Sequence, residues 1–143
     1  MKTVNIFAKS ANGFKIEVQA DDHFMIVDQP KPMGGSDEGA TPMDYLLTAL
    51  GSCIITVGLI VAKQERLPVK GIKVALSGDY DTDVLMGKNT EQRSGFVSIK
   101  VEADVEAPSM TQEEKAAFLA KVEDRCPVTD NLRNNTPVTF TVK

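Results

Sequence analysis

The sequence has few residues of the kinds that build metal sites and disulfide frameworks. Its 143 residues include two cysteines, Cys53 and Cys126, and one histidine, His23. Structural zinc sites and iron–sulfur clusters in proteins use about four Cys or His ligands. A secreted disulfide scaffold is shorter and richer in cysteine. We therefore expect no disulfide scaffold, and no metal site unless carboxylates contribute ligands.

Clusters of basic residues and an apolar leader are also lacking. The formal net charge is -4, and Lys and Arg do not gather into the dense runs that displace counterions from nucleic acid. The first residues, Met1–Asn5, lack the apolar core of a signal peptide. These absences predict a cytoplasmic protein without a nucleic-acid partner. No repeat or linker interrupts the chain, and its length fits a single domain, 1–143.

Charge is absent from one long segment, Tyr45–Ala62, in which apolar residues occur on every face of a helix. Thr41 suits the N-cap and Pro42 the first helical position, and the helix should end near Arg66, before Leu67-Pro68. A membrane span needs about 20 apolar residues. This run is slightly shorter and contains small polar residues, which favours a central helix buried within a soluble protein. We expect no membrane partner, and a second subunit would complete the burial.

The remaining chain alternates between strand and helix patterns. Alternating apolar residues predict three short strands, two long strands and one last strand. Thr111 and Glu114 match a capping box for a second helix, and Pro127 begins a short third one. The order predicts an α+β domain. The expected strands lie near 4–8, 14–18, 24–26, 72–76, 96–105 and 138–142, and the last two helices near 109–125 and 127–133. The segment 30–39, rich in Gly and Pro, and the polar segment 81–94 are expected to be loops.

The two cysteines have different local surroundings. Cys126 would cap the short helix that Pro127 begins, where backbone N–H groups favour a thiolate, and Arg125 and Arg133 lie near in sequence. Incidental capping is the alternative for this residue. Cys53 lies in the middle of the apolar helix, where cysteine most often serves as a small packed side chain. Local sequence alone therefore favours chemistry at Cys126 more than at Cys53.

Two segments carry a resemblance to a known family. The segment from His23 to Pro30, then that from Gly34 to Cys53, resembles the OsmC/Ohr family, as does Cys126-Pro127-Val128. From Pro42 to Cys53 a proline, an acid, a pair of leucines, a pair of small residues and a cysteine fall at the family's spacing. The order of strands and helices agrees over nearly the whole chain.

The resemblance implies an α+β OsmC-like fold, with antiparallel sheets around a long buried central helix, in an intertwined homodimer. It implies reduction of organic hydroperoxides or hydrogen peroxide through a Cys pair, in oxidative-stress defence. Cys53 would be the peroxidatic nucleophile, Cys126 the resolving thiol, and Asp44 an orienting carboxylate. The recycling partner would be a dithiol, either a lipoylated protein or a thioredoxin. No metal or organic cofactor is implied.

The chain departs from the family's peroxidase branch at two points. That branch has Glu directly after the proline, where this chain has Met43, and Asp44 matches another branch whose acid comes one residue later. The branch also uses an N-terminal Arg to hold the reactive Cys as thiolate. This chain has no Arg before Arg66, and Lys9 or Lys15 would have to substitute. We expect weak peroxide reduction that rises with pH. The alternatives are a non-catalytic dimer that binds or senses a small apolar molecule, and a dimer with inert thiols.

Overall fold

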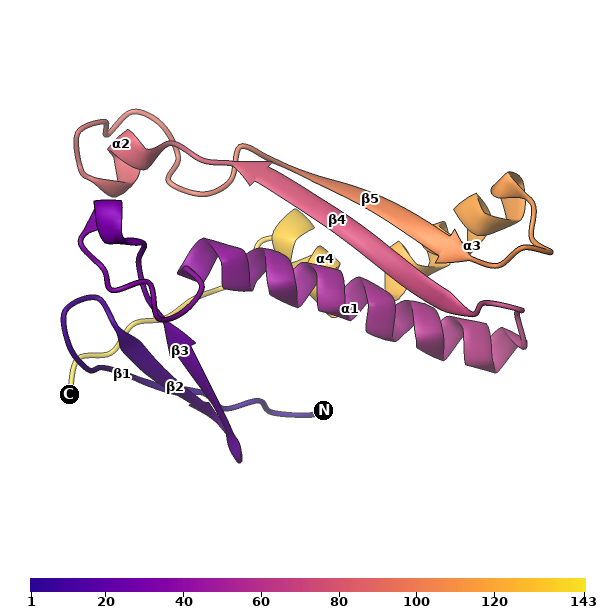
Figure 1. The fold of residues 1–143 in the computed structure, drawn as a ribbon, viewed down its shortest axis with the longest axis horizontal. Coiled ribbons are helices and arrows are strands. Elements are labelled where there is room, and N and C mark those ends of the chain that lie inside the picture. Colours follow the sequence, from indigo (N-terminus) through magenta and orange to yellow (C-terminus); the bar gives the residue numbers. More distant parts are fainter. The chain divides into compact units, whose positions relative to one another are not determined.

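The chain divides into two units. The computed structural model describes residues 1–143, with units Met1–Thr48 and Ala49–Lys143 (Figure 1). The α+β class with antiparallel sheets and one long helix is confirmed, whereas the prediction of a single domain stays a prediction. The elements in chain order are β1 (Phe7–Ser10), β2 (Ile16–Ala20), β3 (His23–Val27), η1 (Lys31–Met33), α1 (Pro42–Glu65), β4 (Gly71–Asp79), α2 (Thr82–Leu85), β5 (Ser98–Glu106), α3 (Gln112–Arg125) and α4 (Pro127–Arg133).

The first unit contains an antiparallel meander in the order β1-β2-β3. The turn between β1 and β2 contains Gly13 at a φ of 57°, a conformation that glycine adopts without steric cost. The turn between β2 and β3 contains Asp21 at a φ of 51°, and Asp is among the residues that tolerate this region best. The first strand begins three residues later than predicted and the second two residues later, whereas the third begins one residue earlier.

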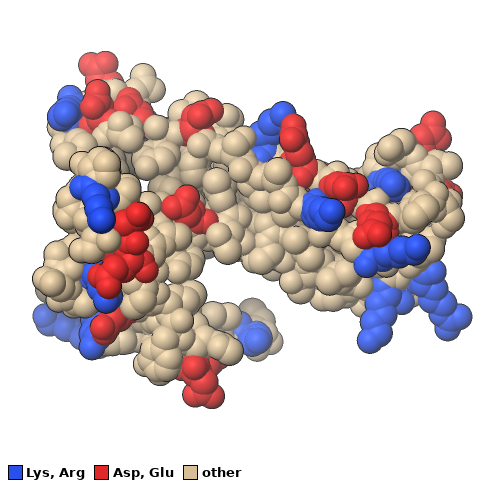
Figure 2. Space-filling model, viewed as in Figure 1, with Lys and Arg blue, Asp and Glu red and all other residues tan.

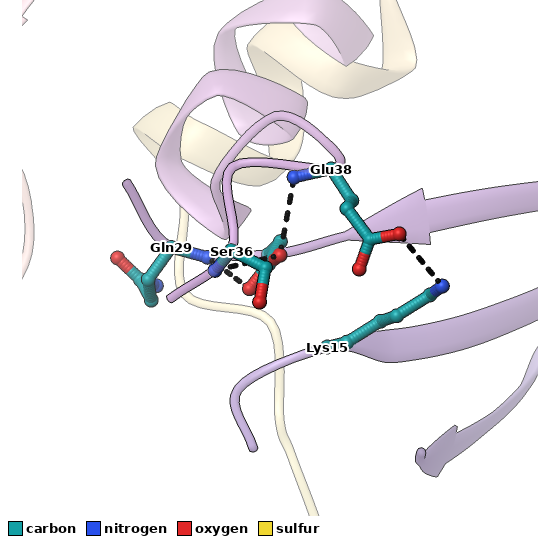
Figure 3. Close-up of polar contacts among 5 residues, drawn as sticks. Lys15, Gln29, Ser36 and Glu38 are labelled. Carbon is teal, nitrogen blue, oxygen red and sulfur yellow. Dashed lines mark hydrogen bonds and ion pairs between the residues drawn. The ribbon is translucent and has the colours of Figure 1, made fainter. Parts of the chain in front are cut away.

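The loop after β3 is organised around one buried carboxylate, that of Asp28, which is 1% exposed. Its oxygens accept backbone N–H bonds from Gln29 at 2.7 Å, Ser36 at 3.2 Å and Glu38 at 3.1 Å (Figure 3). The hydrogen bond from Gln29 is the largest of the influences that lower the pKa of Asp28. A Cβ on Gly35 would collide with the carbonyl of Gln29. The predicted glycine-rich loop is therefore a fixed structure closed on Asp28.

The second unit packs α1 against the β4–β5 hairpin and α3. The two strands pair antiparallel along their full length, from Gly71 opposite Glu106 onward. Glycines let the hairpin approach the helix, because a Cβ on Gly58 would collide with the end of the Ile72 side chain. The core of this unit consists of Leu50, Ile54, Val57, Val61, Ala62, Val105, Ala107, Phe118, Val122 and Cys126.

Within this one chain α1 buries one face and exposes apolar side chains on another. Leu50, Ile54 and Val57 are buried at helical spacing. Leu59 and Ile60 are 48% and 43% exposed. By length and composition the helix is apolar enough to cross a membrane, but a core helix of a soluble protein has the same character. The sequence places apolar residues on every face of α1, but a single chain buries only one of these faces.

Two predictions of local structure were wrong. No strand forms near 138–142, where Val138, Phe140 and Val142 are 74%, 91% and 97% exposed. Alternation shows which side chains share a face, but a strand also needs a neighbour for its backbone hydrogen bonds, and this segment has none in one chain. The loop predicted over 81–94 contains the short helix α2, whose N-cap Asp81 accepts a hydrogen bond from the N–H of Asp83.

Charged side chains of both signs are interspersed on the face shown in Figure 2. Most of the ion pairs join side chains that are more than a third exposed on both sides. Such pairs contribute little to stability, about 0–1 kcal/mol each. The packing of apolar residues, and not surface charge, holds the second unit together.

Candidate functional site

The two cysteines, far apart in sequence, are neighbours in the second unit. Cys53 lies on α1 and packs against the core, and Cys126 is a core residue that is 1% exposed. Both are free thiols. The two thiols influence each other, because Cys53 lowers the pKa of Cys126 and Cys126 raises that of Cys53. The structure therefore brings together the two residues that the sequence singled out as a reactive pair.

Cys126 is held at the junction of two helices. It is the C-cap of α3 and the N-cap of α4, with φ -79° and ψ 110°. The ring of Pro127 excludes helical geometry for the residue before it and fixes its own φ, so α3 ends and α4 begins at this point. The N–H of Thr129 donates a hydrogen bond to Sγ of Cys126 at 3.4 Å. The predicted N-cap position of Cys126 is confirmed.

The surroundings of Cys126 favour its thiolate. Burial acts to raise the pKa of Cys126, but its polar neighbours outweigh this effect: the hydroxyl and backbone N–H of Thr129, the thiol of Cys53 and the N–H of Val128 all lower it. The pKa of Cys126 therefore lies below its usual value. This agrees with the acidity that its N-cap position predicts from sequence.

The surroundings of Cys53 act in the opposite direction. Burial raises the pKa of the Cys53 thiol, and the neighbouring thiol of Cys126 raises it further. The N–H of Val128 partly offsets these effects. No Lys or Arg is among the groups that shift this pKa. The surroundings of the pair therefore favour a thiolate on Cys126 over one on Cys53.

The basic residues considered from sequence have polar partners of their own. An ion pair or hydrogen bond engages each of the four side chains. These contacts join Arg125 to Gln64 at 2.9 Å, Arg133 to Glu123 at 2.8 Å, Lys9 to Glu17 at 3.1 Å, and Lys15 to Glu38 at 3.2 Å. The thiolate of Cys126 thus depends on uncharged hydrogen-bond donors, not on a cation.

Asp44 and Thr41 form reciprocal hydrogen bonds that cap the start of α1. Asp44 Oδ2 accepts hydrogen bonds from the N–H and the hydroxyl of Thr41, at 2.9 and 2.6 Å, and the Asp44 N–H donates to Thr41 Oγ1 at 3.3 Å. The bond from the Thr41 hydroxyl is the main cause that lowers the pKa of Asp44. Asp44 and Cys53 are nine residues apart on the helix, about two and a half turns. The role of Asp44 as an orienting carboxylate for the thiols stays a prediction.

Sequence reasoning missed Thr129. The signal was present, because a residue three positions after an N-cap directs its N–H back to the capping side chain. The side chain of Thr129, however, is recognisable as part of the site only once its burial beside Cys126 is known.

Comparison with known sequences finds one family and two curated relatives. Residues 35–141 match the family described as OsmC-like protein. Organic hydroperoxide resistance proteins of Xanthomonas axonopodis pv. citri (strain 306) and Xanthomonas campestris pv. phaseoli are each 28% identical over 114 residues. The alignment covers 79% of this chain and 74% of each relative.

Solved structures share the fold. An OsmC-like protein from Mycoplasma pneumoniae matches with a TM-score of 0.80 at 20% identity, covering 92% of this chain and 88% of that one. An organic hydroperoxide resistance protein OsmC from Legionella pneumophila matches with a TM-score of 0.72 at 16% identity, covering 94% and 92%. At these identities the likeness concerns the fold alone.

Proposed function

This chain belongs to the OsmC-like protein family, and on that premise we propose that it reduces organic hydroperoxides or hydrogen peroxide through Cys53 and Cys126. The observation that carries the proposal is the pair of adjacent free thiols, one with a raised and one with a lowered pKa. The names of the Xanthomonas relatives favour organic hydroperoxides as substrates. A dithiol, either a lipoylated protein or a thioredoxin, would restore the thiols, and the setting would be cytoplasmic oxidative-stress defence.

In the first step the sulfur of Cys53 attacks the outer oxygen of the peroxide. The thiolate of Cys126 accepts the proton of Cys53, because the two side chains are neighbours. The O–O bond breaks, Cys53 becomes a sulfenic acid, and the departing alkoxide takes the proton from Cys126 and leaves as the alcohol. Peroxide is reduced by two electrons, and the sulfur of Cys53 is oxidised by two.

In the second step the thiolate of Cys126 attacks the sulfur of the Cys53 sulfenic acid. An S–S bond forms, the S–O bond breaks, and hydroxide takes a proton from solvent to leave as water. The dithiol reductant then cleaves the disulfide by exchange and is itself oxidised to a disulfide. In this scheme Asp44 contributes by starting the helix that carries Cys53.

The test is peroxide consumption with dithiothreitol as reductant. Wild-type protein should consume cumene hydroperoxide and form a Cys53–Cys126 disulfide, visible by mass spectrometry without reductant. Cys53→Ser should abolish consumption, and Cys126→Ser should allow one attack and leave Cys53 as sulfenic or higher acids. Wild-type protein that consumes neither cumene hydroperoxide nor hydrogen peroxide up to about pH 9, near the free-thiol pKa, would remove this function.

The alternative is a non-catalytic dimer that binds or senses a small apolar molecule. An open cavity of about 390 Å³ lies at the start of β4 and the end of β5, away from both cysteines. Its lining is mixed: the charged side chains of Lys73, Asp104, Glu106 and Lys115 stand beside the apolar side chains of Ile72, Val105, Ala107 and Pro108. A mixed lining of this kind does not single out an apolar ligand, so this cavity does not carry the alternative.

A further inference from the structure

Thr129 has a buried hydroxyl for which the fold provides no ordinary partner. The residue is 8% exposed, and Thr129 Oγ1 is the buried side-chain atom left without a hydrogen-bond partner. A buried, unpaired hydroxyl destabilises a protein, and a valine of the same shape would avoid that cost. The packing of the core therefore does not explain why a threonine occupies this position.

Thr129 lies next to the sulfur of Cys126. Thr129 lies in the first turn of α4, and its backbone N–H already donates to Sγ at 3.4 Å. Its hydroxyl also acts on Cys126, where it stabilises the charged form. The backbone N–H of Thr129 is thus one donor to this sulfur, and the unpaired hydroxyl of the same residue and the thiol of Cys53 are its polar neighbours.

No charged side chain takes part at Cys126. The groups that face the sulfur are Thr129, the backbone N–H of Val128, and Cys53. Three of the charged residues near Cys126 along the chain make contacts elsewhere. These contacts are Arg125 with Gln64, Asp130 with Asn134, and Arg133 with Glu123. Hydrogen bonds from Thr129 therefore have to stabilise this thiolate, as a cation does at other thiolates.

We propose that Thr129 is a positioning residue whose hydroxyl donates to the thiolate of Cys126, so that the single negative charge of the thiol pair rests on Cys126. This deepens the proposed function, on which it rests for the use that is made of the thiolate. A hydroxyl donor to an anionic acceptor forms a strong hydrogen bond and has no competing partner here.

The charge on Cys126 serves two steps of the thiol cycle. It supplies the nucleophile that closes the disulfide. It also makes Cys126 the better leaving group when a dithiol reductant attacks the sulfur of Cys53, because a more acidic thiol leaves faster. In that exchange the S–S bond of the pair breaks, a mixed disulfide forms on Cys53, and Cys126 departs as the thiolate that Thr129 holds. The reductant's second thiol then displaces Cys53.

The experiment is a pH titration of Cys126 in the full chain, with Cys53→Ser to leave one thiol. The absorbance of the thiolate near 240 nm reports ionisation and requires no access of reagent to the buried sulfur. Thr129→Val should lower the thiolate fraction about tenfold at a fixed pH below the midpoint, the usual scale of one hydrogen bond to a charged group. Thr129→Ser keeps a hydroxyl and should titrate like the parent. A Thr129→Val protein that titrates like the parent would overturn the proposal.

Two further measurements separate this role from a structural one and from the proposed function. Thr129→Val should unfold at the same or a higher denaturant concentration than the parent. If the valine variant does not fold, Thr129→Ala, which also lacks the hydroxyl, gives the same titration test. With both cysteines present, Thr129→Val should make the Cys53–Cys126 disulfide harder to reduce by dithiothreitol. Because the titration uses no peroxide, a protein that fails to consume peroxide can still support or overturn the role of Thr129.

Discussion

At the scale of single residues, the two cysteines differ in how far local sequence describes them. The acidity of Cys126 could be predicted, because Pro127 alone is enough to place a helix start after it. The reactivity of Cys53 could not be predicted in the same way, since its neighbours along α1 include no ionisable group that would identify it as reactive. Its partner, Cys126, comes from a distant part of the chain, and only the resemblance to a family connected the two.

The unequal acidities of the pair predict the pH dependence of the first step. The pKa of Cys53 is raised and that of Cys126 is lowered, so at neutral pH Cys53 needs Cys126 to accept its proton. With Cys126→Ser that acceptor is lost. The rate of the first turnover, followed by stopped-flow loss of peroxide, should then rise roughly tenfold per pH unit below the pKa of Cys53.

Wild-type protein is the control for this profile. The wild-type rate should reach half its maximum at a lower pH than the rate of the Cys126→Ser variant, because the thiolate of Cys126 forms at a lower pH than that of Cys53. If the two profiles coincide, Cys126 does not act as the base for Cys53, although it can still serve as the resolving thiol.

A second prediction at this scale concerns Asp28. Its folded-state pKa is lowered, chiefly by the N–H of Gln29. The carboxylate therefore adds stability that is complete above its unfolded pKa, near 3.8, and that disappears as the pH falls through the lower, folded value. Asp28→Asn should lower the denaturant midpoint at neutral pH, because its amide group presents a donor to N–H groups that are themselves donors.

The pH dependence of that loss is the decisive part of the measurement. The difference in midpoint between wild type and Asp28→Asn should shrink as the pH falls below about 3.8, the ordinary value for Asp. Asp37→Asn, in the same loop but with an exposed side chain, is a matched control and should leave the midpoint nearly unchanged. A difference that stays constant down to about pH 2, well below that ordinary value, would mean that the Asp28 charge does not hold the loop.

At the scale of elements, helix ends were predictable and strand pairing was not. The capping box of Thr111 and Glu114 forms as the sequence indicates, with the Thr111 hydroxyl accepting from the Glu114 N–H at 3.1 Å. Capping involves residues within one turn, so a short sequence window contains all of it. A strand instead depends on an edge supplied from elsewhere, and the alternating segment 138–142 is left without one.

The structure of the loop before α1 shows the same distinction. Glycine and proline content predicted a loop between β3 and α1, and the structure has a loop there that includes the short 3-10 helix η1. The convergence of three N–H groups on Asp28 joins residues up to ten positions apart, which no local pattern encodes. Tyr45 adds a second tie, since its hydroxyl donates to the carbonyl of Ile26 at 2.9 Å. The helix start and the end of β3 are thus fixed together within the first unit.

At the scale of the whole molecule, exposed apolar surface remains on a chain of ordinary composition. Soluble monomers rarely leave large contiguous apolar areas in contact with water. Here large apolar side chains stand exposed along α1 and in the last residues of the chain, including Leu59, Ile60, Val138, Phe140 and Val142. A second copy of the chain would cover the free face of α1 and offer an edge to the alternating segment. We therefore propose a homodimer, with α1 in the interface.

The homodimer predicts how one substitution changes the mass in solution. Ile60→Lys places a charge on the exposed apolar face of α1, and burying it in an interface would cost several kcal/mol without a partner. Sedimentation equilibrium at micromolar concentration should give the mass of two chains for wild type and of one chain, or an unfolded chain, for the variant. Lys63→Glu changes an exposed charge beyond the apolar run and should leave the dimer intact. A folded wild-type monomer under the same conditions would contradict the proposal, because the apolar face of α1 would then be stable in water.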